Sequence, residues 1–247
     1  MKKKEKLVTI YAVNIDRNMT VEEYGYILSY LNNNIGHVFA KYKNYSDAQR
    51  FLVGKLLTYI SIVKNKLSIS INDIIIQKNL YGKPYLYNKP EFHFNISHSG
   101  NWVVCATFSQ PIGIDIEQIK PIEYSDIAKR YFTKDEYRSL LSADLPDRLS
   151  YFYEIWTCKE SYIKMIGKGL SIPVDSFSIR LENRPIKIYD NNGAVLRCII
   201  KQYNFDNNYK MAVCVPDIMF QENISVYDID FIMNNAGSIL KGGKCGE

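Results

Sequence analysis

Short stretches in which apolar and polar residues alternate occur along the whole chain, and this pattern is typical of β-strands. The first, at residues 7–15, is also rich in β-branched side chains. The others lie at residues 92–97, 102–108, 112–117, 177–181, 196–203 and 209–215, and one more short strand is expected at 225–232. The sequences SGN (99–101), NNG (191–193) and DNN (206–208) predict turns between neighbouring strands.

Other stretches repeat their apolar residues at the spacing of a helix. In residues 47–63 the stripe includes Phe51 and Leu52, and Ser46 or Asp47 is the expected N-cap. Residues 145–166 predict the longest helix, which ends at Gly167. Shorter helices are expected at residues 21–31, 124–130 and 134–141.

Each half of the chain holds an initial strand, then helices, then a group of strands. We therefore predict an α+β fold of two similar lobes that meet near residues 110–111, with the ligand site in the cleft between them. The N-terminal lobe is expected at residues 1–109 and the C-terminal lobe at 110–233. Residues 234–247 contain four glycines, and we expect them to form a disordered tail.

Composition and charge narrow the class of protein. The formal net charge of +5 suits an anionic ligand or an acidic partner, but it is too small to predict nucleic-acid binding. No apolar run is long enough to cross a membrane, so we expect no membrane partner. The five cysteines are scattered and form no CxxC pair, which favours reduced thiols in the cytoplasm and argues against a zinc site.

Two acidic motifs carry the candidate chemistry. In IGIDIE (residues 112–117), Asp115 and Glu117 point to one face of the predicted strand, with the isoleucines on the other face. In WTCKESYIK (156–164), Glu160 and Lys164 are neighbours on a predicted helix. Alone, these residues also suit a solvent-exposed strand and a surface ion pair. Together, three carboxylates and one lysine predict a site for a hard divalent cation next to a phosphate, as in a phosphate-transferring enzyme.

Three segments resemble the signature motifs of the 4'-phosphopantetheinyl transferases, in the same order and with compatible spacing. They are FNISHSG (94–100), IGIDIE (112–117) and WTCKESYIK (156–164). Chain length and further matches at 81–84, 171–181 and 210–214 resemble the surfactin-synthetase-associated (Sfp-type) branch. The resemblance implies a pseudo-twofold monomer. It would transfer phosphopantetheine from coenzyme A to a serine of apo peptidyl or acyl carrier proteins and release adenosine 3',5'-bisphosphate.

The resemblance also implies roles for individual residues. Asp115, Glu117 and Glu160 match the Mg²⁺ ligands, which also accept Mn²⁺. The remaining matches are with coenzyme A: Lys164 and Asp115 near the pyrophosphate, Ser97 and His98 at the phosphates, and Arg50 and Lys83 at the nucleotide end.

Some alternatives stay open. Glu160 is a metal ligand, the general base for the carrier serine, or both. Members of this branch commonly have two lysines, shortly before the residue that Arg50 matches, that contact the 3'-phosphate of coenzyme A. At the corresponding positions this chain has Ile35 and Val38, so Lys41 or Lys43 would have to replace the two lysines. A Mg²⁺-dependent pyrophosphatase or nucleotide hydrolase, and a binding module without turnover, are the competing functions. An acceptor surface at residues 119–131 and 166–176 would favour the transferase, whereas Glu136 is expected to be structural.

Overall fold

Two β-sheets form the middle of the molecule. The computed structural model describes residues 7–31, 44–65, 67, 73–183, 185–216 and 221–241. The first sheet contains, in spatial order, β11 (Gln221–Asp228), β1 (Leu7–Asn14), β5 (Trp102–Phe108) and β4 (His93–Ser99). The second contains β6 (Gly113–Gln118), β10 (Tyr209–Pro216), β9 (Val195–Tyr203), β8 (Ile186–Asp190) and β7 (Phe177–Arg180). A separate hairpin joins β2 (Ile76–Lys78) to β3 (Pro84–Leu86).

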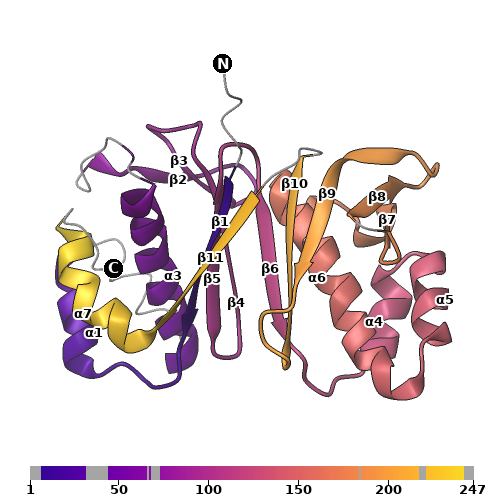
Figure 1. Cartoon of the computed structure of the whole chain (residues 1–247), viewed down its shortest axis with the longest axis horizontal. Coiled ribbons are helices and arrows are strands. Elements are labelled where there is room, and N and C mark those ends of the chain that lie inside the picture. Colours follow the sequence, from indigo (N-terminus) through magenta and orange to yellow (C-terminus); the bar gives the residue numbers. More distant parts are fainter. Residues whose placement is uncertain are drawn as a thin grey trace.

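Helices cover the outer face of each sheet, so the strands lie between two helical layers (Figure 1). Next to the first sheet lie α1 (Val21–Tyr30), α3 (Tyr45–Lys64) and α7 (Ile229–Leu240). Next to the second lie α4 (Tyr124–Tyr131), α5 (Lys134–Ser142) and α6 (Arg148–Ile166). The predicted α+β class and the two-lobed plan are therefore confirmed. In the described parts of the chain, no helix has the length and hydrophobicity needed to cross a membrane.

Two helix starts differ from the prediction. Asn44, rather than Ser46 or Asp47, caps α3, because its side-chain oxygen accepts a hydrogen bond from the Ser46 backbone N–H. The region predicted as one helix from residue 145 begins with a 3₁₀ turn, Leu145–Asp147, and α6 starts at Arg148. Consequently α6 has 19 residues and α3, with 20, is longer.

A third apolar core joins the lobes. The inner faces of the two sheets pack on each other, with alternate side chains of β1 and β5 meeting those of β6 and β10. Ile112, Ile114 and Ile116 lie in this core and are fully buried, as the alternating pattern predicts. Because the lobes share this core, the site residues that each lobe carries are held in a fixed relation to those of the other.

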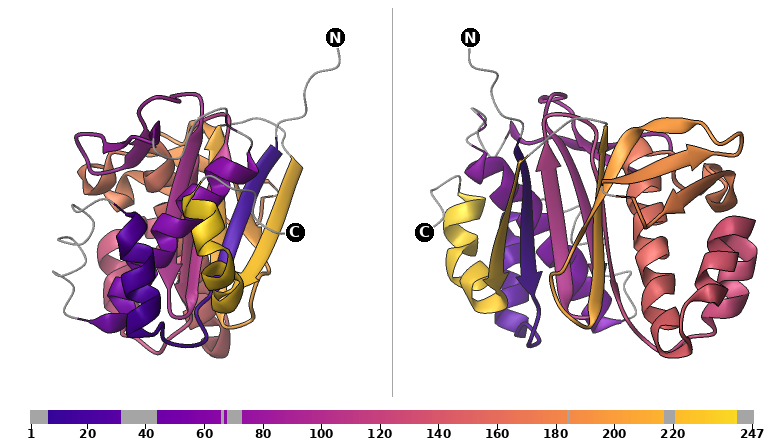
Figure 2. Two further views of the ribbon diagram at one scale, coloured as in Figure 1. Left: turned by 90° about the vertical axis from the view of Figure 1, so that its left-hand side faces the viewer. Right: turned by 45° about the vertical axis from the view of Figure 1, so that its right-hand side comes forward.

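The C-terminal segment was assigned to the wrong lobe by the sequence pattern. β11 pairs in parallel with β1, and α7 packs on α1 and α3, so both complete the N-terminal lobe (Figure 2). The expected tail forms a helix through Leu240, capped by the Asp228 side chain. In the sequence Gly237 indicates a flexible tail, whereas in the structure it allows α7 to pack closely on α1. A Cβ at this position would overlap the Tyr26 hydroxyl of α1.

Candidate active site

The edges of the two sheets meet at β4 and β6, where side chains replace the usual backbone ladder. Three side chains of β4 accept hydrogen bonds from the backbone of β6. These bonds run from Ile114 N–H to Asn95 Oδ1 (2.9 Å), from Ile116 N–H to Ser97 Oγ (3.4 Å) and from Gln118 N–H to Ser99 Oγ (3.1 Å). The ladder fixes the register of the two strands, and so places the serines of β4 beside the carboxylates of β6.

A glycine lets α6 approach this junction. A Cβ at Gly113 would overlap the backbone carbonyl oxygen of Ser161 and the backbone nitrogen of Met165. Glycine at this position therefore allows α6 to lie directly on β6. The close approach brings Lys164, near the end of α6, within reach of Asp115.

Asp115 is at the centre of the site and is almost completely buried, with 2% of its surface exposed. Its Oδ1 atom accepts hydrogen bonds from Lys164 Nζ (2.6 Å) and Ser97 Oγ (2.8 Å). Lys164 Nζ also donates to Ser97 Oγ, at 2.9 Å. The other oxygen, Oδ2, is buried and has no hydrogen-bond partner among the described residues. A buried carboxylate oxygen without a partner is costly, so it marks a place for a further cation or donor.

Glu117 and Glu160 lie close enough to Asp115 for its negative charge to affect their pKa values. Burial and the Asp115 charge raise the pKa of Glu117 to about 7, although Ser99 donates a hydrogen bond to it at 2.7 Å. Burial and the same charge raise the pKa of Glu160. In the described residues, no three His, Cys, Asp or Glu side chains are already arranged to hold a metal ion. The unpartnered Asp115 oxygen and the mutual repulsion of the carboxylates nevertheless fit a divalent cation.

Basic side chains lie beside the carboxylates. His98 is exposed, but loss of hydration and the charges of Arg50 and Lys164 lower its pKa below the usual value. Arg50 donates to the Gly100 carbonyl (2.9 Å) and pairs with Asp47 (2.6 Å), so α3 is tied to the β4–β5 turn. This side of the site therefore carries excess positive charge, which suits a phosphate.

A cavity of about 270 Å³ lies between the β2–β3 turn and α6. Lys83, Glu160 and Lys164 line it, whereas the predicted residues Arg50, Ser97, His98, Asp115 and Glu117 do not. Lys83 does not project its ammonium group freely into the cavity. The group donates to the backbone carbonyls of Ile112, Lys164 and Met165. Ile35, Val38, Lys41 and Lys43 lie outside the described residues.

Sequence reasoning missed three contributors to this region. Asn95 and Ser99 belong to the β4–β6 ladder. Lys159, on the helix that carries Glu160, points to α5 instead and forms a fully buried ion pair with Glu136. The polar alternation of residues 95, 97 and 99 was the available signal, because an edge strand rarely carries three polar side chains toward a buried neighbour. The structural role expected for Glu136 is confirmed: it forms the capping box of α5 with Thr133 and accepts two hydrogen bonds from Lys159.

Comparison with known proteins identifies the class. A family model described as "4'-phosphopantetheinyl transferase superfamily" matches residues 111–214. A second, "4'-phosphopantetheinyl transferase, N-terminal", matches residues 18–110. The chain is 41% identical over 227 residues to 4'-phosphopantetheinyl transferase Sfp of Bacillus subtilis strain 168, covering 91% of this chain and 99% of that protein. The chain therefore belongs to the 4'-phosphopantetheinyl transferase superfamily.

Two further relatives agree with this assignment. 4'-Phosphopantetheinyl transferase ffp of Bacillus subtilis is 39% identical, covering 91% of this chain and 99% of that protein. L-Aminoadipate-semialdehyde dehydrogenase-phosphopantetheinyl transferase of Mus musculus is 32% identical, covering 78% of this chain and 70% of that protein. This chain is thus an enzyme that transfers phosphopantetheine to carrier proteins, and the hydrolase alternative has no support among these relatives.

Proposed function

We propose that the donor is coenzyme A and that the acceptor is a serine of apo peptidyl or acyl carrier domains. The serine oxygen bonds to the phosphorus that bears the pantetheine arm. The bond from that phosphorus to the bridging oxygen breaks, and adenosine 3',5'-bisphosphate leaves with the electron pair. The observation that carries this proposal is the unpartnered Asp115 Oδ2 beside the Lys164 ammonium. The Asp115 oxygen can bind a cation and the Lys164 ammonium can bind an anion. A divalent metal ion together with the pyrophosphate of coenzyme A would supply both.

Asp115, Glu117 and Glu160 are the proposed ligands of Mg²⁺, with Mn²⁺ as a substitute. When bound, the metal supplies positive charge that neutralises the pyrophosphate oxygens. Ser97 and Ser99 orient two of these carboxylates through the hydrogen bonds described above. Glu160 receives the serine proton directly or through water, and its raised pKa suits a base near neutral pH.

Lys164, Ser97, His98 and Arg50 are the proposed contacts for coenzyme A phosphates. Lys164 stabilises the charge that appears on the leaving phosphate, so its contribution grows in the transition state. Arg50, and His98 once a bound phosphate favours its protonated form, add positive charge at the nucleotide end. The charges of Arg50 and Lys164 both act on His98, which supports placing the three side chains near one another.

The acceptor surface is proposed at residues 119–131 and 166–176, where Ile122 and Ile166 are 38% and 42% exposed. A helical carrier domain with apolar and acidic side chains would suit this surface. We also propose a cytoplasmic monomer. Cys105, Cys198 and Cys214 are buried free thiols, as expected in a reducing compartment, and one chain carries every proposed site residue.

The test uses the full chain with an apo carrier domain, coenzyme A and Mg²⁺, followed by mass spectrometry. We expect the carrier to gain one phosphopantetheine while an equal amount of adenosine 3',5'-bisphosphate is released, and we expect EDTA to stop both. A serine-to-alanine carrier serves as the control. Release of free 4'-phosphopantetheine at the same rate without any carrier would identify a hydrolase and reject the proposal.

A further inference from the structure

The turn between β2 and β3 is fastened to the C-terminal end of α6. Asn79 organises this turn, because its Oδ1 atom accepts hydrogen bonds from the backbone of Tyr81 and Lys83, both at 2.9 Å. Its Nδ2 atom donates to the Gly167 carbonyl at 2.8 Å. A hairpin of the N-terminal lobe is thereby attached to the helix that carries Glu160 and Lys164.

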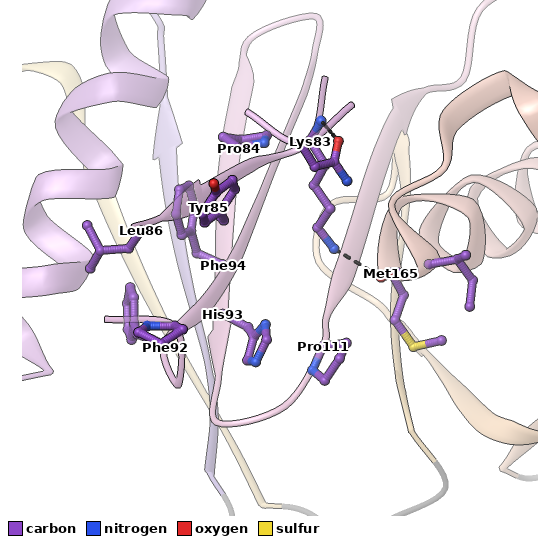
Figure 3. Close-up of a pocket in the computed structure, with 12 residues that line it drawn as sticks. Lys83, Pro84, Tyr85, Leu86, Phe92, His93, Phe94, Pro111 and Met165 are labelled. Atoms are coloured by element: carbon purple, nitrogen blue, oxygen red, sulfur yellow. Dashed lines mark hydrogen bonds between the residues drawn. The ribbon is translucent and has the colours of Figure 1, made fainter. Parts of the chain in front are cut away.

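Lys83 makes the main part of this attachment (Figure 3). Its Nζ atom donates to the carbonyl oxygens of Ile112 (2.9 Å), Lys164 (2.6 Å) and Met165 (3.0 Å). An ammonium group has three protons, so these three acceptors use all of them. Ile112 directly precedes β6, whereas the other two carbonyls belong to the last turn of α6. One positive charge thus joins the start of β6 to the end of α6.

The surroundings are shaped for the Lys83 side chain. Gly167 has a positive φ of 73°, and a Cβ there would lie 2.7 Å from Lys83 Cδ. Lys83 lines two cavities: one of about 270 Å³, which Glu160 also lines, and one of about 330 Å³, which Phe94 also lines. The C-terminal carbonyls of a helix lack intrahelical partners and carry partial negative charge, so a buried cation there is stabilising.

We propose that Lys83 is a positioning residue: its ammonium group fixes the end of α6 against β6, and so holds Lys164 at Asp115, without contacting coenzyme A. The inference rests on the proposed function for its kinetic consequence alone. It replaces the nucleotide contact that the family resemblance implies for Lys83. Without the charge, the last turn of α6 loses two hydrogen bonds and the Ile112 carbonyl loses one, so Lys164 moves relative to the reacting phosphorus.

The central variant is Lys83→Met, which keeps the aliphatic stem and removes the charge. We expect kcat to fall by on the order of tenfold to a hundredfold, because small displacements of a catalytic group have effects of this size. KM for coenzyme A should change less than about threefold, since a positioning residue adds no ground-state contact. The ratio of kcat/KM for coenzyme A to that for dephospho-coenzyme A should stay unchanged. Lys78→Met, in the same hairpin and exposed, is the matched control and should behave like the wild type.

Hydrogen exchange gives a readout that needs no turnover. The Gly167 amide donates to the Ile163 carbonyl at 2.9 Å in the last turn of α6. Its exchange should accelerate at least about tenfold in Lys83→Met but not in Lys78→Met, because local opening becomes easier. If Lys83→Met does not fold, Asn79→Ala removes the bond to Gly167 and must lower kcat in the same direction by a smaller factor.

The outcomes separate this inference from the proposed function. A KM that rises for coenzyme A but not for dephospho-coenzyme A would show that Lys83 contacts the 3'-phosphate and would overturn the inference. Unchanged exchange at Gly167, or unchanged kcat, would overturn it as well. If the wild-type chain transferred no phosphopantetheine, the proposed function would fail, whereas the exchange experiment would still decide whether Lys83 holds the helix end.

Discussion

Two lysines of α6 form ion pairs that differ in how completely they are satisfied. Lys159 pairs with Glu136 and Lys164 pairs with Asp115, both through close nitrogen–oxygen contacts of 2.8 and 2.6 Å. The side chains of the first pair are 0% and 1% exposed, whereas those of the second pair are 27% and 4% exposed. The same residue types on one helix therefore occupy a closed site and an open site.

In the closed pair, every polar atom has partners. Both Glu136 oxygens accept from Lys159, and they also accept from the backbone of Thr133 and Ile179. The third proton of Lys159 is donated to the Phe177 carbonyl at 2.6 Å. This arrangement holds α5, α6 and β7 together, and each polar side-chain atom of the pair already has a hydrogen-bond partner in the protein.

In the open pair, Asp115 Oδ2 has no partner among the described residues, and Lys164 reaches the cavity beside Glu160. A buried pair stabilises a fold when all of its groups are satisfied, and an incomplete pair is available for a substrate or an ion. We therefore expect variants of the open pair to lose activity and variants of the closed pair to lose stability.

The largest expected effect is that of Asp115→Asn on transfer. The amide keeps the shape but lacks the charge, so the proposed metal site and the Lys164 contact both weaken. We expect kcat/KM to fall by on the order of a thousandfold or more, about 4 kcal/mol. Carrier loading followed by mass spectrometry measures the rate. Asp144→Asn, at an exposed position outside the proposed site and the proposed acceptor surface, is the control. Near-normal turnover of Asp115→Asn in excess Mg²⁺ would contradict the metal assignment.

The closed pair should respond through stability. Lys159→Met leaves the Glu136 charge buried without its partner, so we expect the free energy of unfolding to fall by about 3–5 kcal/mol. Urea unfolding followed by circular dichroism measures this change. Lys210→Met removes the partly exposed pair between Lys210 of β10 and Glu154 of α6, and should cost less than about 1 kcal/mol. Equal losses for the two variants would show that the closed pair contributes no more to stability than a partly exposed one.

Glu160→Gln should have the next largest effect. Loss of the carboxylate weakens metal binding and removes a proton acceptor, so we expect kcat to fall by on the order of a hundredfold. Glu154→Gln, also on α6, is the matched control because Glu154 is paired with Lys210 away from the cavity. Single-turnover kinetics with saturating coenzyme A measures the chemical step. A Glu160→Gln enzyme that changes KM alone would place this residue in substrate binding.

Much of the fold follows from local pattern, and the exceptions have long-range causes. Strands such as β6 and β10 were predictable because one face is apolar and turn residues bound them. The assignment of β11 and α7 was not, because their partners β1, α1 and α3 lie about 200 residues away in the sequence. Gly237 illustrates the difficulty: a glycine that enables helix packing has the same composition signal as one in a flexible tail.

The residues of the site were predicted better than their contacts. The motifs identified Asp115, Glu117, Glu160 and Lys164 as a group, but the i,i+4 spacing suggested that Lys164 pairs with Glu160. Its partners in the structure are Asp115 and Ser97, because Gly113 lets α6 rest on β6. Lys83 shows the same limit: the family resemblance implies a contact with the nucleotide end of coenzyme A, whereas the three acceptors of its ammonium group are carbonyls of the protein itself.

The smallest effect concerns His98, which belongs to the open side of the comparison. Reduced hydration and the charges of Arg50 and Lys164 lower the pKa of His98 below its usual value, which favours the neutral ring in the free enzyme. A bound phosphate favours the protonated ring and raises this pKa. Affinity for coenzyme A should therefore be highest at low pH and decrease as pH rises through the pKa of the complex.

We expect a decrease of roughly threefold, below the full value of a charge-assisted hydrogen bond because His98 is exposed. Isothermal titration calorimetry at pH 7 in two buffers of different ionisation enthalpy measures the proton uptake directly. His98→Gln should abolish that uptake and flatten the pH dependence of coenzyme A affinity, leaving only the ionisation of the ligand. His93→Gln, at the other end of β4, is the matched control. If both variants retain the wild-type proton uptake, His98 does not face a phosphate, and the cationic side of the site is limited to Arg50 and Lys164.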